Sequence, residues 1–89
     1  MTLFTGMINL TTHFEIIKGE KEKISNFTLS FTLSESKKIS DLKEQFKTEV
    51  FQLKPLNIIK FEVSDRKNEL NDDFVIEKSS NLVSKVFIS

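Results

Sequence analysis

Residues 26–34 have the sequence Asn-Phe-Thr-Leu-Ser-Phe-Thr-Leu-Ser, in which apolar and polar side chains alternate without a break. Successive side chains of a β-strand point to opposite faces, so this period of two predicts a strand with one apolar and one hydroxyl-bearing face. The apolar face needs a cover, whereas the polar face can meet water. The stretch therefore predicts a sheet that is covered on one side only.

A second alternating stretch lies upstream. One set of alternate positions is mainly apolar and consists of Ile8, Leu10, Thr12, Phe14 and Ile16. The other set is polar and consists of Asn9, Thr11, His13 and Glu15. The charged segment 18–23 separates the two stretches and includes Gly19, which can adopt a positive φ. We expect residues 8–16 and 26–34 to pair as a β-hairpin with a solvated loop.

Downstream of residue 34 the apolar period changes to steps of three and four. The residues of this stripe are Ile39, Leu42, Phe46, Val50 and Leu53. Such spacing predicts the buried face of a helix. Pro55 disfavours helical geometry at Lys54 and should end the helix, and both Ser36 and Ser40 are chemically suited to be its N-cap.

Alternation returns in two further segments. The first segment alternates apolar Ile59, Phe61 and Val63 with polar Lys60, Glu62 and Ser64. The second segment is residues 82–88, in which Val86 and Ile88 alternate with Lys85 and Phe87. Between them lie a polar turn, residues 65–68, and a short apolar element around Leu70, Phe74 and Ile76. The predicted order is two strands, one helix and two or more strands, an α+β domain in which the helix covers one face of the sheet.

Composition excludes several classes of protein. The chain has 89 residues, which suits one domain, and we expect residues 7–89 to form it after a short tail, residues 1–6. Basic and acidic residues number 13 each, so no long-range field attracts nucleic acid or anionic lipid. The absence of Cys excludes disulfides and thiolate ligands and fits an intracellular, reducing compartment. Apolar runs of only two or three residues predict no membrane span.

The residues that could do chemistry are few. His13 is the single histidine, and its parity places it on the polar face. Asp72 and Asp73 are adjacent, so their side chains should point apart and favour a turn rather than an acid–base pair. Gly6 and Gly19 are isolated and form no phosphate-binding loop. We therefore expect no enzyme, no metal site and no cofactor.

This order of elements resembles the β-grasp of ubiquitin-like domains. The core positions that carry the resemblance are Leu29, Phe31, Leu33, Ile39, Leu42, Phe46, Ile59 and Phe61, followed by the segment Asp73-Phe74-x-Ile76-x-Lys78-x-Ser80-x-Leu82. The resemblance implies a mixed four- or five-stranded sheet packed on one helix.

Within that superfamily the chain is similar to the DWNN domain of RING-type ubiquitin ligases and mRNA 3′-end processing factors. The similar segments are His13-Phe14, Asp41-Leu42-Lys43-x-Gln45-Phe46, and Lys67-x-Glu69-Leu70-Asn71-Asp72-Asp73 continuing into Phe74-Val75-Ile76-x-Lys78-Ser79-Ser80. The resemblance implies the N-terminal module of a larger nuclear protein that docks on the mRNA cleavage and polyadenylation machinery, with ligase activity in a separate RING domain. Outside that family we expect a cytoplasmic location.

Two surfaces are candidates for binding other proteins. Partners of ubiquitin commonly dock on an apolar patch of the third and last strands, and the matching positions here are Lys60, Val83 and Lys85. Because two of the three are charged, this surface is either a solvated face or a basic docking site, and not a mimic of ubiquitin. The other candidate is the strand that carries Thr28, Ser30, Thr32 and Ser34, because in this fold it is a sheet edge with free backbone groups.

Two alternatives remain open. Modifiers of this superfamily need a flexible Gly-Gly tail, whereas this sequence ends Val86-Phe87-Ile88-Ser89, so a modifier would have to be truncated before that tail. The other alternative is a free-standing β-grasp subunit of a bacterial or viral assembly. In each case we expect protein partners, no direct contact with nucleic acid or membrane, and a monomeric isolated domain.

Overall fold

A computed structural model describes residues 7–55 and 57–89, and the expected tail, residues 1–6, lies outside the described residues. The elements are β1 (Ile8–Lys18), β2 (Glu22–Leu33), β3 (Lys37–Lys38), α1 (Ile39–Leu53), β4 (Ile58–Ser64), β5 (Val75–Ile76) and β6 (Ser80–Ile88). The hairpin, the helix and both later strands were predicted. The two-residue strands β3 and β5 were not.

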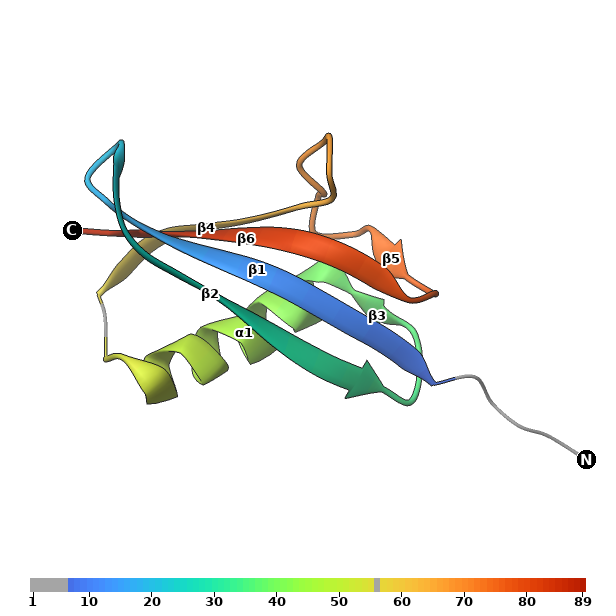
Figure 1. Cartoon of the computed structure of the whole chain (residues 1–89). Coiled ribbons are helices and arrows are strands. Elements are labelled where there is room, and N and C mark those ends of the chain that lie inside the picture. Colours follow the sequence, from blue (N-terminus) through green and yellow to red (C-terminus); the bar gives the residue numbers. More distant parts are fainter. Residues whose placement is uncertain (1–6, 56) are drawn as a thin grey trace, which may run out of the picture.

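The main sheet has the strand order β2-β1-β6-β4. Its central pair, β1 and β6, is parallel, whereas β1–β2 and β4–β6 are antiparallel. α1 lies across one face of this mixed sheet, and β3 and β5 form a small second sheet beside it (Figure 1). The prediction of an α+β domain with one helix packed on a mixed sheet is confirmed, and of the four or five strands expected the main sheet has four. The arrangement is compatible with a β-grasp fold.

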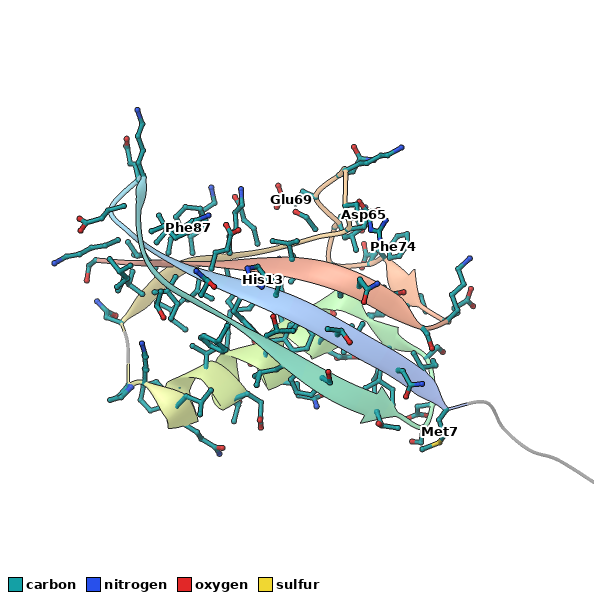
Figure 2. All side chains as sticks on the ribbon, in the orientation of Figure 1. Met7, His13, Asp65, Glu69, Phe74 and Phe87 are labelled. Atoms are coloured by element: carbon teal, nitrogen blue, oxygen red, sulfur yellow. The ribbon has the colours of Figure 1, made fainter. Side chains whose placement is uncertain are left out.

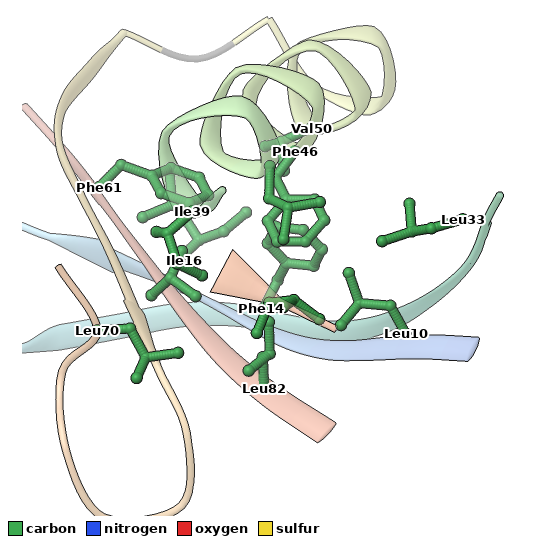
Figure 3. Close-up of a cluster of buried hydrophobic side chains, with 14 of the residues drawn as sticks. Leu10, Phe14, Ile16, Leu33, Ile39, Phe46, Val50, Phe61, Leu70 and Leu82 are labelled. Atoms are coloured by element: carbon green, nitrogen blue, oxygen red, sulfur yellow. The ribbon is translucent and has the colours of Figure 1, made fainter. Parts of the chain in front are cut away.

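Phe14 on β1 is the centre of the core. Its ring stacks on Phe27 at 5.1 Å between centroids and meets the edges of Phe46 at 5.7 Å and Phe61 at 6.4 Å. Figure 3 shows Phe14 and Phe46 facing each other between the sheet and α1. Aromatic rings prefer these stacked and edge-on arrangements. Through these three contacts Phe14 packs β1 against β2, α1 and β4.

The helical stripe is mostly as predicted. Ile39, Leu42, Phe46 and Val50 are completely buried. The prediction for Leu53 is wrong, because its side chain is 59 % exposed, and Phe51 in the same last turn is 56 % exposed. The end of α1 after Val50 therefore contributes little to the core. The predicted helix end is confirmed, since α1 ends at Leu53.

β4 contains a β-bulge that overturns one predicted core position. Ile58 pairs with Ile88, but the next pair is Lys60 with Phe87, so Ile59 is the extra residue. Ile59 is 64 % exposed, and Ile58 packs against the core in its place. Alternation resumes after the bulge, with Phe61 and Val63 buried as expected.

The start of α1 is capped by backbone groups and not by a serine. The N-cap is Lys38, which makes no side-chain capping bond, so the prediction of Ser36 or Ser40 is wrong. Instead, the N–H of Ile39 donates to the carbonyl of Phe74 at 2.9 Å, and the N–H of Ser40 donates to the carbonyl of Asp72 at 3.1 Å. The turn before β5 therefore satisfies two amide groups that a helix start leaves unpaired.

Candidate functional site

β2 is an edge of the main sheet and is 12 residues long. Within residues 7–55 and 57–89, β1 is the strand that pairs with it, and its other side carries no strand. Thr28, Ser30 and Thr32 are exposed on the face away from α1, as predicted from their parity. An exposed strand edge offers a row of backbone N–H and C=O groups to another strand.

Two hydroxyl groups on this face of β2 bond to side chains of the neighbouring strand β1. The Nδ1 atom of His13 lies 3.0 Å from the Oγ1 atom of Thr28, and the hydroxyls of Thr11 and Ser30 lie 3.4 Å apart. The single histidine is therefore part of the polar sheet surface (Figure 2). It follows that the backbone edge of β2, more than its hydroxyl row, is the part of the strand left open to a partner.

The inner face of β2 carries apolar side chains that are covered only in part. Phe27, Leu29 and Phe31 are half-buried, although they pack against the core. Phe31 contacts the ring of Phe46 on α1, with 5.1 Å between centroids. Because these side chains belong to the edge strand, a strand added to β2 would remove more apolar surface from water.

From Ser25 to Leu33, β2 lacks the features that usually protect a sheet edge, since its charged residues Glu22 and Lys23 and a bulge at Ile24 all lie at its N-terminal end. Residues 24–34 contain no charged residue and no proline, and the pairing with β1 is regular from Ser25 to Leu33. Natural proteins commonly place charges, prolines or bulges on exposed edges to prevent pairing with other chains. A long, regular and uncharged edge is therefore a surface that can accept a strand.

The opposite edge, β4, does carry such devices. It contains the bulge at Ile59 and two charged side chains, Lys60 and Glu62. Its C-terminal end is also covered, because Ser64 forms a β-bridge with Glu69 and the N–H of Leu70 donates to the carbonyl of Val63 at 2.9 Å. The two edges of the sheet thus differ in their ability to pair.

The second candidate surface, Lys60, Val83 and Lys85, lies on the outer face of β4 and β6. The Nζ atom of Lys60 is 2.9 Å from a carboxylate oxygen of Glu62 and 5.5 Å from the ring centre of Phe87. The hydrogen bond and the charge of Glu62 raise the pKa of Lys60 above its usual value of 10.5. Lys60 is therefore engaged by its own neighbours.

Lys85 also stands among carboxylates. The strand register places it opposite Glu62 on β4 and Glu15 on β1. Glu15 in turn lies 3.4 Å from the Nζ atom of Lys23 on β2. Lysines and glutamates thus alternate in a charge row that runs from β2 across β1 and β6 to β4, where its last two residues lie (Lys23, Glu15, Lys85, Glu62 and Lys60). The two carboxylates of this row offset much of its positive charge.

A groove lies beside β5, at the end of the molecule that carries the turn at Asp65. The groove has a volume of about 400 Å³ and lies between the turn at Asp65 and the segment from Phe74 to Leu82. Figure 2 shows Asp65 and Phe74 at the same end of the molecule. Among the described residues, no three His, Asp or Glu side chains gather where they could hold a metal ion. No helix in this part of the chain combines the length and apolar composition of a membrane span.

Asp72 and Asp73 have separate structural surroundings. Asp72 lies 2.8 Å from the Nζ atom of Lys43 on α1, and the N–H of Asp73 donates to the side-chain oxygen of Asn71 at 3.0 Å. They belong to the turn that caps α1.

No family model, curated protein or solved structure matches this chain.

Proposed function

We propose that this chain is a non-catalytic protein-interaction domain of the ubiquitin-like β-grasp superfamily that binds a partner strand along β2. The observation that carries this proposal is the contrast between the two edges of the sheet. β2 is regular and uncharged from Ser25 to Leu33, whereas β4 is bulged, charged and partly covered. Strand addition at a free edge obtains affinity from backbone hydrogen bonds and specificity from alternate side chains.

The charge row makes the outer face the weaker candidate. Lys60 and Lys85 were expected to form either a solvated face or a basic docking site, and the neighbouring Glu15 and Glu62 favour the first interpretation. A partner that docked there would have to replace existing ion pairs. At the β2 edge it would only displace water.

The similarity to the DWNN domain extends this proposal to a biological setting. In that setting the chain is the N-terminal module of a larger nuclear protein of mRNA 3′-end processing and ubiquitin ligation. The support is the set of similar segments around His13, Asp41–Phe46 and Lys67–Ser80.

Site-specific photo-cross-linking tests the use of the β2 edge. Benzoylphenylalanine is placed at Thr28 or Thr32 in cells that express the protein, and at Gln52, an exposed residue of α1, as the matched control. The proposal predicts a discrete protein adduct from the β2 positions and none from position 52. If the β2 positions give no adduct, or the control gives the same one, β2 is not the binding surface.

A further inference from the structure

We propose that the strand bound by β2 is β2 of a second copy of this chain. The two copies pair antiparallel about a two-fold axis and join two four-stranded sheets into one continuous sheet. This inference rests on the proposed function, because it names the partner of the same edge. It also revises the expectation that the isolated domain is monomeric.

The register follows from the regular part of β2, Ser25 to Leu33, whose central residue is Leu29. Residues that face each other in an antiparallel pair lie on the same side of the sheet. A two-fold axis at Leu29 therefore places Phe27 opposite Phe31 of the second copy, and Thr28 opposite Ser30. Apolar side chains meet apolar ones on the inner face, and hydroxyls meet hydroxyls on the outer face.

The half-buried inner row argues for a second copy as the occupant. An axis perpendicular to the sheet keeps both α1 helices on the same side, so the rows Phe27, Leu29 and Phe31 of the two copies become neighbours. Each row then covers the surface that the other leaves exposed. A foreign strand would need the same alternation of large apolar side chains, and this chain already carries it.

The charges are also compatible with self-pairing. No charged residue lies between 24 and 34, so no like charges meet inside the paired segment. The first charged residues beyond its two ends are Lys23 and Glu35, which have opposite signs. An antiparallel arrangement brings the end that carries Lys23 next to the end of the second copy that carries Glu35.

The contrast between the edges predicts a closed dimer and not a fibre. Pairing of β2 with β4 of another copy would be head-to-tail and would continue from chain to chain. The bulge at Ile59 and the bridge between Ser64 and Glu69 obstruct that contact. Pairing of β2 with β2 uses the same patch on both copies and closes after two chains.

The first test measures the mass of the purified chain by light scattering across a dilution series. The inference predicts a species of twice the 10.3 kDa chain mass, which dissociates on dilution. The variants T28K/S30K and T28E/S30E each place like charges opposite one another in this register and should be monomeric. An equimolar mixture of the two should restore the dimer, because lysines then face glutamates.

Matched controls carry the same charges elsewhere. N81K/Q52K and N81E/Q52E change exposed residues outside the β2 edge and should leave the dimer intact. Circular dichroism of every variant shows whether it is folded. A wild-type chain that is monomeric at all concentrations overturns the inference. So does a dimer that persists in T28K/S30K, or an assembly that grows beyond two chains.

A second measurement does not depend on added charge. The chain contains no Cys, so L29C introduces a single thiol on the proposed two-fold axis. Oxidation should link L29C chains into a disulfide dimer, whereas Q52C should remain unlinked under the same conditions. Equal linking of the two variants overturns the register.

The two proposals fail in different ways. A monomeric purified chain whose β2 positions cross-link to another protein in cells overturns the second copy and keeps the β2 edge as a binding surface. A chain that is monomeric and gives no β2 adduct overturns both.

Discussion

The hydroxyl oxygens of Thr12 and Ser84 lie 2.8 Å apart on the inner face of the sheet, and both residues are completely buried. Their hydrogen bond joins β1 to β6, the parallel pair at the centre of the sheet. A buried hydroxyl is costly when it has no partner. We therefore expect Thr12→Val to lower the free energy of unfolding by about 1–3 kcal/mol, because it leaves the Ser84 hydroxyl unpaired.

A double-mutant cycle checks this pairing. The double variant T12V/S84A removes both hydroxyls and should cost less than the sum of the single changes, with a coupling of about 0.5–3 kcal/mol. Urea unfolding of the four proteins gives the free energies. Thr11→Val, on the outer face of the same strand, is the control and should have a small effect. Additive costs in the cycle would show that the two hydroxyls do not stabilise each other.

The bulge in β4 makes a second prediction. Ile59→Ala should change the free energy of unfolding by no more than about 0.5 kcal/mol, because the side chain is mostly exposed. Phe46→Ala should cost about 3–5 kcal/mol through loss of core contacts and the cavity left behind. Ile58→Ala should fall between them. An Ile59→Ala variant as unstable as Ile58→Ala would show that β4 lacks the bulge.

Much of the fold was predictable because local periods reflect burial on one face. The alternation of β1 and β2 and the spacing of Ile39 to Val50 assign the covered faces before any contact is known. The bulge was not predictable, since Ile58 and Ile59 are identical and only the pairing with β6 distinguishes them. The cap of α1 was missed for a similar reason, because its carbonyls belong to residues far along the chain.

The candidate surfaces were predictable to different extents. Parity placed Lys60 and Lys85 on an outer face and Thr28 on the polar face of β2. The carboxylates beside Lys85 depend on the parallel register of β1 and β6, which no local pattern specifies. The edge position of β2 came from the resemblance to a known fold, and the strand order now supports it.

Asp65 makes the stability of its turn depend on pH. One oxygen of its carboxylate accepts hydrogen bonds from the N–H groups of Asn68 and Lys67, each at 2.8 Å. These bonds lower the pKa of Asp65 from its usual value of 3.8. Because the folded pKa is below the unfolded one, the stabilisation is complete above the unfolded pKa and is lost as the pH falls through the folded value.

Substitution of Asp65 isolates this effect. D65N should be less stable than the wild type at neutral pH, and the difference should shrink in acid. Unfolding temperatures measured between about pH 6 and pH 2 test this. Asp73→Asn is the control, since the Asp73 carboxylate accepts no hydrogen bond among the described residues. A difference between D65N and wild type that stays constant over this range would contradict the role of the charged carboxylate.

The charge row makes the last prediction. Lys85→Glu places three carboxylates side by side across β1, β6 and β4, since the strand register puts position 85 between Glu15 and Glu62. We expect a loss of roughly 0.2–1 kcal/mol of unfolding free energy for each like-charged pair. The loss should shrink when salt is added, because exposed charges are screened. Lys78→Glu makes the same charge change outside the row and should have a smaller effect. A loss that does not respond to salt would mean that packing, and not charge, is disturbed at position 85.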